Sequence, residues 1–228
     1  MHEVTFQQLK ESKFHSPIIT DVIFDQEKVI EIITDWVNIA DKGFDTLWDA
    51  NMFNFLWKYG KEPIEVMPKL VEYCDVVMGN IWSANKMLGI SVDEHIHENK
   101  SREKYLAHAK RTSLEIIERF PKCEVVANTF RFDSESDDVL YYTSLFTNGQ
   151  QYNSAEFTCK GVVDRSGSGD CFMAGLIYGL YKKMEPQEIV DYATAAAFGK
   201  LQEHGDATGQ DVLTVSENKK INTENAIK

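Results

Sequence analysis

The sequence has no uninterrupted apolar stretch of the ~18 residues that a membrane-spanning helix requires. Its first 13 residues lack the apolar core of a secretory signal peptide. Cysteines are few: the four, Cys74, Cys123, Cys159 and Cys171, lie far apart and form no Cys-x-x-Cys pair. A disulfide framework and a zinc ribbon are therefore not expected. These absences predict a cytoplasmic protein with reduced thiols.

Basic residues are also scarce, with 24 Lys and Arg against 36 Asp and Glu and a net charge of −12. This balance argues against nucleic acid or an anionic membrane as a partner. The negative charge is still compatible with a phosphate ligand, because a nest of backbone amides binds phosphate even in an acidic protein. With 228 residues and 43% hydrophobic content, the chain is expected to form one domain over 1–228, with a frayed polar tail at 216–228.

Three familiar motifs are missing. The sequence contains no GxxxxGK[ST], which excludes a P-loop nucleotidase. Ser166 occupies the position of the first glycine in a GxSxG nucleophile elbow. Gly169 is followed by Asp170-Cys171-Phe172, so the third glycine of a dinucleotide fingerprint is absent. The hypothesis that the protein is a nicotinamide oxidoreductase is consequently supported only by a Gly-x-Gly sequence and by the α/β pattern described next.

Short β-branched runs alternate with longer patterns of helical period. The expected helices are 26–42, 63–74, 101–120, 170–183 and 186–203. The expected strands are 16–24, 44–50, 75–79, 123–130, 139–146 and 151–157, the last two joined by a turn at Asn148-Gly149. This alternation predicts an α/β fold with three layers, α-β-α, in which a mostly parallel sheet is flanked by helices.

The densest chemical signal lies at residues 161–180. A β-like stub at 161–164 leads into Ser166-Gly167-Ser168-Gly169, and Asp170 opens a strongly apolar helix. The two glycines allow successive amides to point at one place, and a helix start adds unpaired amides and about half a positive charge. This combination predicts an anion site beside a carboxylate that accepts a proton. The alternative is that Ser168 or Asp170 merely caps a buried helix.

The run from Asp164 to Asp170, followed by an apolar helix, resembles the C-terminal signature of the ribokinase-like (PfkB) carbohydrate kinases. Further segments are similar to the 2-keto-3-deoxygluconate kinase branch of that family. These are Phe14-His15, Ile19-Thr20, Leu56 to Lys61, Asp75 to Asn80, and Ala195 to Lys200.

The resemblance implies ATP-dependent phosphorylation of a sugar or sugar-acid hydroxyl, with Mg²⁺ bridging the phosphates. Asp170 would be the catalytic base, and Gly167, Ser168 and Gly169 would form the anion hole. Asp49 and Asn51 match a substrate-binding Asp-x-Asn-Tyr-Arg pattern. The implied nucleotide-binding residues are Asn80, Thr129, Arg131, Ser166 and Lys200.

Compared with that family, the chain begins partway, without the N-terminal strands and the lid. A sheet that lacks strands has an open edge, through which we expect association into a homo-oligomer. Phe53 stands where the pattern has Arg, and Ser83 where the family's Asn-x-x-Glu motif has Glu. These two departures keep a second hypothesis open, a remnant that binds nucleotide or sugar without turnover.

Two further candidate sites have weaker support in the sequence. His95 and His97 lie in a polar connection with acidic neighbours, where a metal site competes with a solvated loop. We expect the solvated loop, and no metal site. Cys171 follows Asp170 at a helix start, where a reactive thiol competes with a packed one. We expect the packed thiol.

Overall fold

Five strands form one mixed sheet in this computed structural model, which describes residues 62–97, 101–133 and 138–226. The strands are β1 (Val76–Gly79), β2 (Val125–Asp133), β3 (Val139–Thr147), β4 (Gln150–Asn153) and β5 (Phe157–Cys159). β1 runs parallel to β2, whereas β3 runs antiparallel to β2, β4 and β5. The expectation of a mostly parallel sheet is therefore wrong for the described residues. A tight turn joins β3 to β4, with positive φ at Asn148 and Gly149 (51° and 75°), and such turns connect only antiparallel strands.

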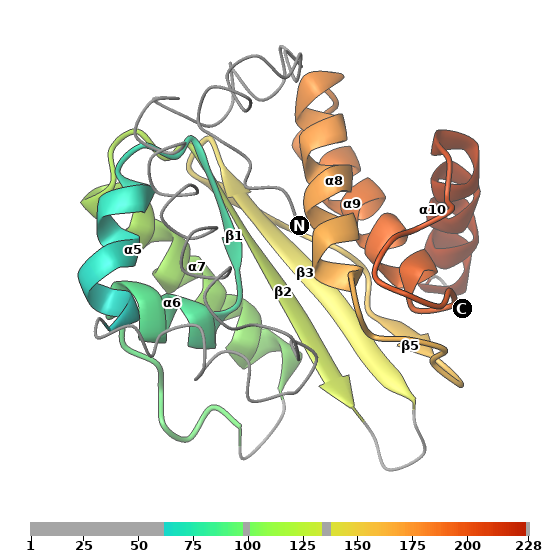
Figure 1. Cartoon of the computed structure of the whole chain (residues 1–228), viewed down its shortest axis with the longest axis horizontal. Helices are drawn as coiled ribbons and strands as arrows, with labels where there is room; N and C mark the ends of the chain where they lie inside the picture. Colours follow the sequence, from blue (N-terminus) through green and yellow to red (C-terminus); the bar gives the residue numbers. More distant parts are fainter. Residues whose placement is uncertain (1–61, 98–100, 134–137, 227–228) are drawn as a thin grey trace, which may run out of the picture.

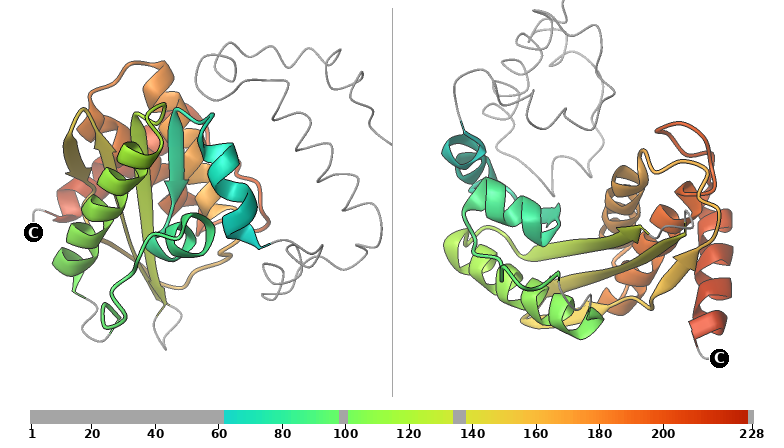
Figure 2. Two further views of the ribbon diagram at one scale, coloured as in Figure 1. Left: turned by 90° about the vertical axis from the view of Figure 1, so that its left-hand side faces the viewer. Right: turned by 90° about the horizontal axis from the view of Figure 1, so that it is seen from below.

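Helices cover both faces of the sheet, as the sequence predicted (Figure 1). One face carries α5 (Pro63–Val71), α6 (Ile81–Leu88) and α7 (Arg102–Arg119). The other face carries α8 (Ser168–Tyr181) and α9 (Pro186–Lys200), and α10 (Val212–Ala226) packs outside α9. Figure 2 shows these two groups of helices on opposite sides of the strands. The three-layer α-β-α architecture is confirmed.

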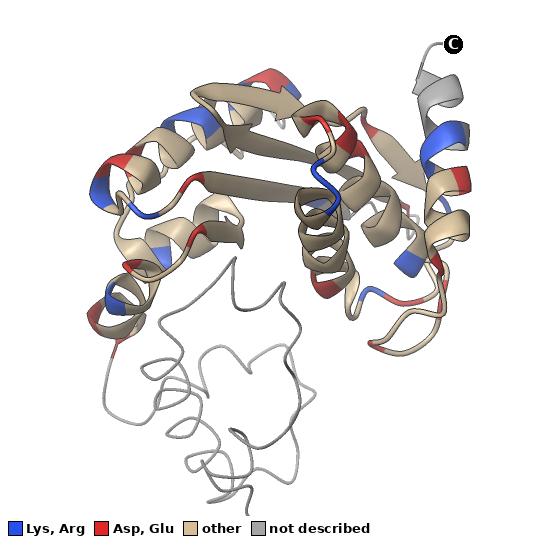
Figure 3. Cartoon of the chain, turned by 90° about the horizontal axis from the view of Figure 1, so that it is seen from above, with Lys and Arg blue, Asp and Glu red and all other residues tan. Residues whose placement is uncertain are grey.

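The alternation of side chains along β2 divides the core into its two halves. Val125 and Ala127 are buried against α8 and α9, whereas Val126 between them is buried against the α5–α7 side. Successive side chains of a strand point to opposite faces, so a continuous apolar run is suited to a sheet covered on both sides. The strands carry few charges and the outer helices carry most of them (Figure 3).

Four local features differ from the expectations. The strand expected at 151–157 is divided into β4 and β5, and residues 154–156 between them form no strand. Residues 161–164 form no strand; instead the amide of Val163 donates to the carbonyl of Leu201 over 2.9 Å. The tail expected to fray from 216 onward belongs to α10 as far as residue 226. Val215 buries this helix against Tyr192, and the carboxylate of Asp211 accepts the amide of Thr214 over 2.8 Å at its start. The short helix α6 was not expected.

β1 is the outermost strand of the described sheet, next to β2 alone. The association of copies expected through an open edge stays a prediction. Within the described part of the chain, no helix is both long enough and apolar enough to cross a membrane. The elements expected at 16–24, 26–42 and 44–50, and the substrate residues Asp49 and Asn51, lie outside the described residues.

Candidate active site

A pocket of about 280 Å³ opens where β1 stops short of β2. Gly79, the last residue of β1, pairs with Asn128, and β2 continues to Asp133 with this edge uncovered by β1. The carboxyl ends of parallel strands and the first turns of α6 and α8 meet here, which is where α/β sheets place ligands. The described lining residues are Asn80, Ile81, Trp82, Tyr105, Thr129, Phe130, Arg131, Phe132, Tyr141, Ser168 and Gly169.

The first turn of α8, whose amides have no partner within the helix, contributes Ser168 and Gly169 to the pocket lining. Gly167 precedes the helix with φ 72°, a left-handed conformation, and none of the described side chains caps it. The hydroxyl of Ser168 donates instead to the carbonyl of Arg165 over 3.1 Å. The amide of Cys171 donates to the carbonyl of Gly167 over 2.9 Å, so the helix's own hydrogen bonds start only there. The alternative in which Ser168 or Asp170 caps the helix is therefore wrong, and the amides of the first turn can bind an anion.

Asp164 fixes the loop that precedes α8 through two hydrogen bonds. One carboxylate oxygen accepts the amide of Ser166 and the other accepts the amide of Gly205, each over 2.9 Å. These hydrogen bonds, those from Ser166 first, lower the pKa of Asp164 to about 2. The second bond ties the loop before α8 to the loop after α9, where Asp206 comes so close to Gly167 that a Cβ would overlap its carbonyl oxygen.

Replacing Asp164 by Asn is expected to lower the melting temperature at neutral pH, because an amide cannot accept both backbone N–H groups through oxygen. A carboxyl group whose folded pKa lies below its unfolded value of about 3.9 stabilises the fold above that pH. Its contribution is lost as the pH falls to about 2. Melting curves of the two proteins should therefore converge between about pH 4 and about pH 2. A difference that persists unchanged at the lowest pH would contradict this role of the Asp164 charge.

Of the residues implied by the family resemblance, the structure brings five together in the pocket lining: Asn80, Thr129, Arg131, Ser168 and Gly169. Asn80 also caps α6, since its side-chain oxygen accepts the amide of Ser83 over 2.8 Å. Gly167 lies directly before Ser168 at the helix start. Asp170 follows Gly169 in the first turn of α8 and is exposed, beside the pocket rather than in its lining.

Two of the implied nucleotide-binding residues lie elsewhere. Ser166 contributes its amide to Asp164 and does not line the pocket. Lys200 is fully buried at the end of α9, where its ammonium group donates to the carbonyl of Glu203 over 2.9 Å. Its charge helps to lower the pKa of Asp164. Lys200 thus stabilises the loop after α9 and the loop before α8. A direct contact between Lys200 and nucleotide stays a prediction.

The described lining has one charged side chain, that of Arg131, and no carboxylate. Together with the helix amides and the hydroxyl of Thr129, this arrangement fits an anionic group such as a phosphate. Ser83, in the position of the family's Glu, brings no acid to this end of α6. The described lining therefore offers donors to an anion and supplies no carboxylate ligand for Mg²⁺.

Sequence reasoning missed the aromatic part of the lining. The ring of Tyr105 packs edge-on against the rings of Phe130 and Phe132. Tyr141 joins them because β3 pairs with β2 in a register that sets Tyr141 opposite Arg131. The alternation of the strand could have placed Tyr141 on the α8 side of the sheet, but only the register shows that it reaches the pocket.

The loop that carries His95 and His97 is solvent-exposed, as expected, whereas the absence of a metal site there stays a prediction. Residues 93–95 and His97 are exposed, and the described residues contain no group of three or more His, Cys, Asp or Glu side chains able to hold a metal ion. Cys171 is buried, and burial raises the pKa of its thiol, as expected for a packed cysteine.

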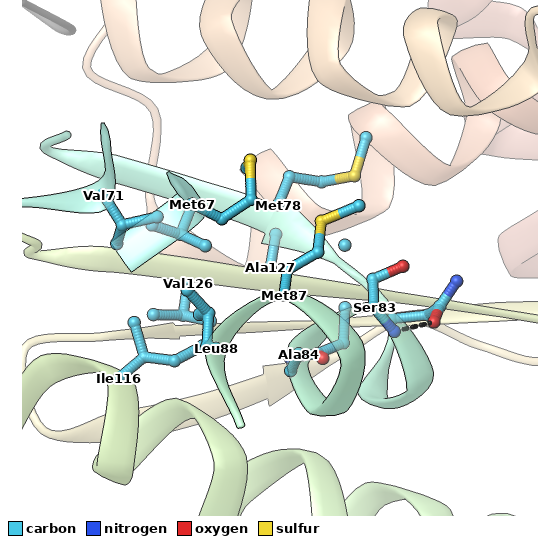
Figure 4. A pocket seen from close by; sticks show the side chains of 14 residues that line it. Met67, Val71, Met78, Ser83, Ala84, Met87, Leu88, Ile116, Val126 and Ala127 are labelled. Carbon is cyan, nitrogen blue, oxygen red and sulfur yellow. Dashed lines mark hydrogen bonds between the residues drawn. The ribbon is translucent and has the colours of Figure 1, made fainter. Parts of the chain in front are cut away.

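A second pocket, of about 70 Å³, lies between α5, α6 and β1 and is lined mainly by Met and aliphatic side chains (Figure 4).

Solved structures of two carbohydrate kinases share this fold. The chain is similar to 2-dehydro-3-deoxygluconokinase from Thermotoga maritima, with 26% identity and a TM-score of 0.62 over 83% of this chain and 54% of that one. It also matches the fold of a PfkB family carbohydrate kinase from Listeria grayi, with 22% identity and a TM-score of 0.57 over 85% and 55%. The chain thus spans about half the length of the structures that it matches.

The sequence itself matches a protein-family profile over residues 31–212, and the profile is that of the pfkB family carbohydrate kinases. A search of curated proteins found no significant match.

Proposed function

The chain belongs to the pfkB family of carbohydrate kinases, and from this premise we propose that it transfers a phosphoryl group from Mg·ATP to a hydroxyl of a sugar or sugar acid. The observation that carries the proposal is the pocket at the carboxyl edge of the sheet. There Thr129 and Arg131 from β2 meet Ser168 and Gly169 at the start of α8. The oxidoreductase alternative has no support from the family match.

The first turn of α8 supplies the electrostatic part of this chemistry. Amides of Gly167, Ser168 and Gly169 would bind the oxygens of the transferring phosphoryl group, where negative charge is concentrated. Arg131 would neutralise part of the triphosphate charge from β2. These groups are held by the fold before the ligand arrives, so little reorganisation is needed during the reaction.

Asp170 would act as the general base. Its carboxylate is exposed and follows Gly169 of the pocket lining, and the acceptor hydroxyl would lie between this base and the phosphoryl group. As the hydroxyl oxygen attacks phosphorus, its proton passes to Asp170 and ADP leaves. Mg²⁺, when bound with ATP, neutralises charge on the phosphates; the described lining assigns it no carboxylate ligand.

The test is thermal melting of the purified chain with and without millimolar Mg·ATP. A ligand that binds only the folded state stabilises it by about 2.7 kcal/mol at a hundredfold excess over Kd. We expect a clear upward shift in melting temperature with Mg·ATP and none with NADH. A cooperative melt that Mg·ATP leaves unmoved would contradict a nucleotide site.

A second function, binding without turnover, is favoured by one observation, the absence of a carboxylate from the described pocket lining. It predicts the same melting shift with Mg·ATP. Release of ADP across a panel of sugars and sugar acids separates the two proposals. Sugar-dependent ADP release supports the kinase, and ATP binding without any such release supports the remnant.

A further inference from the structure

We propose that Tyr141 is an additional ligand-binding residue of this pocket, whose phenol O–H donates a hydrogen bond to a phosphoryl oxygen of the bound nucleotide. The inference rests on the proposed function and extends it to a side chain outside the signature loop.

Tyr141 combines a buried polar group with a place in the pocket lining. Its side chain is 2% exposed, and its hydroxyl is buried without a hydrogen-bond partner among the described residues. Leaving a buried hydroxyl unpaired destabilises the fold, so few such groups occur in folded proteins. Tyr141 nevertheless lines the pocket, together with Ser168 and Gly169 of the helix start. A ligand oxygen in the pocket would give this hydroxyl the partner that it lacks.

The surroundings of Tyr141 select an anionic partner. Arg131 lies directly opposite on β2, on the same face of the sheet, and the unpaired amides of α8 lie across the pocket. All of these groups are donors or positive, which favours an oxygen that accepts several hydrogen bonds at once. Burial raises the pKa of the phenol well above its ordinary value, so Tyr141 keeps its proton and remains a donor.

The next residue of the strand provides a matched control. Tyr142 is also buried, at 1% exposure, and its hydroxyl likewise has no partner in the described part of the chain. It faces the α7 side of the sheet, stacked on Phe130, and does not line the pocket. Tyr141→Phe and Tyr142→Phe therefore remove the same group from opposite faces of the sheet.

The experiment measures the affinity of the wild-type chain and of both variants for Mg·ATP, inorganic tripolyphosphate and adenosine, with the melting temperature of each unliganded protein. Hydrogen bonds to charged groups are the strong ones, so Tyr141→Phe should weaken binding of Mg·ATP and tripolyphosphate about 10-fold or more. Adenosine, which has no phosphate, should bind Tyr141→Phe as it binds the wild type. Tyr142→Phe should bind all three probes normally.

Neither variant should melt below the wild type, because each loses a hydroxyl that has no partner in the unliganded fold. Unchanged affinity of Tyr141→Phe for tripolyphosphate would overturn the role of Tyr141 and leave the proposed kinase intact. So would an equal loss in both variants, a loss that extends to adenosine, or a marked fall in melting temperature in Tyr141→Phe alone. A wild-type chain that binds neither Mg·ATP nor tripolyphosphate would overturn the proposed function, and the phosphoryl ligand of Tyr141 with it.

Discussion

Replacing Asp170 by Asn is expected to reduce sugar-dependent ADP release by about 10²-fold or more while leaving the affinity for Mg·ATP close to that of the wild type. The amide is nearly isosteric with the carboxylate, but it cannot accept the proton of the attacking hydroxyl. The binding groups at the helix start are backbone amides, which the substitution leaves in place. Removal of one negative charge near the phosphates should, if anything, favour ATP.

The control for this variant is Glu103→Gln. Glu103 is an exposed acid in the first turn of α7, on the opposite face of the sheet from α8, and it does not line the pocket. It should change neither turnover nor ATP affinity. Turnover is measured with a sugar that the wild type phosphorylates, and affinity by the Mg·ATP melting shift. An equal loss of turnover and affinity in Asp170→Asn would show that Asp170 binds nucleotide instead of acting as the base.

Replacing Gly167 by Ala is expected to abolish the melting shift with Mg·ATP and to destabilise the unliganded chain by about 2 kcal/mol or more. Two effects add at this position. The φ of 72° is a left-handed conformation that strains any residue with a side chain, and the new Cβ would overlap the carbonyl oxygen of Asp206. Relief of that overlap requires movement of backbone, and the amides at the start of α8 would move with it.

Gly169→Ala is the stability control, because a Cβ at Gly169 meets no atom within 4 Å and the backbone there is helical. Its melting temperature without ligand should equal or exceed that of the wild type, since Ala favours a helix more than Gly does. Denaturant titration of both variants gives the free energies of unfolding. Equal stabilities for Gly167→Ala and Gly169→Ala would contradict the account of the tight approach between Gly167 and Asp206.

The loop from Asp164 to Asp170 was predictable from the local sequence pattern. Two glycines, two serines and an aspartate ahead of an apolar helix predicted the unpaired amides of α8, and the structure places them at a pocket. The same reasoning predicted β1, β2, β3 and α7 to within a few residues, because these elements depend on apolar periodicity, on turn residues and on the Ser101 cap. It failed for α6, which Asn80 starts and Gly89, with φ 68°, ends after eight residues, too few for a clear periodic signal.

Pairing between distant segments was not predictable in the same way. Beyond the antiparallel hairpin at Asn148-Gly149, the sequence suggested a mostly parallel sheet because β–α alternation usually produces one, and only the structure shows that β2 also pairs antiparallel with β3. Lys200 matched the family pattern as a nucleotide-binding residue, yet its ammonium group lies buried on the carbonyl of Glu203. Such a position depends on how α9 packs, which a linear motif does not contain.

Sequence patterns were sufficient to predict the two covered faces of the sheet, the family of the chain and the loop that begins α8. These follow from interactions between residues close along the chain: side-chain alternation, turn and cap preferences, and the backbone freedom of Gly167. The strand pairing was needed to show that β1 ends short of β2, and that Tyr141 stands opposite Arg131 in the pocket opened by that difference in length. The physical reason is that strand register and helix packing depend on contacts between residues far apart in sequence, whose partners no local pattern specifies.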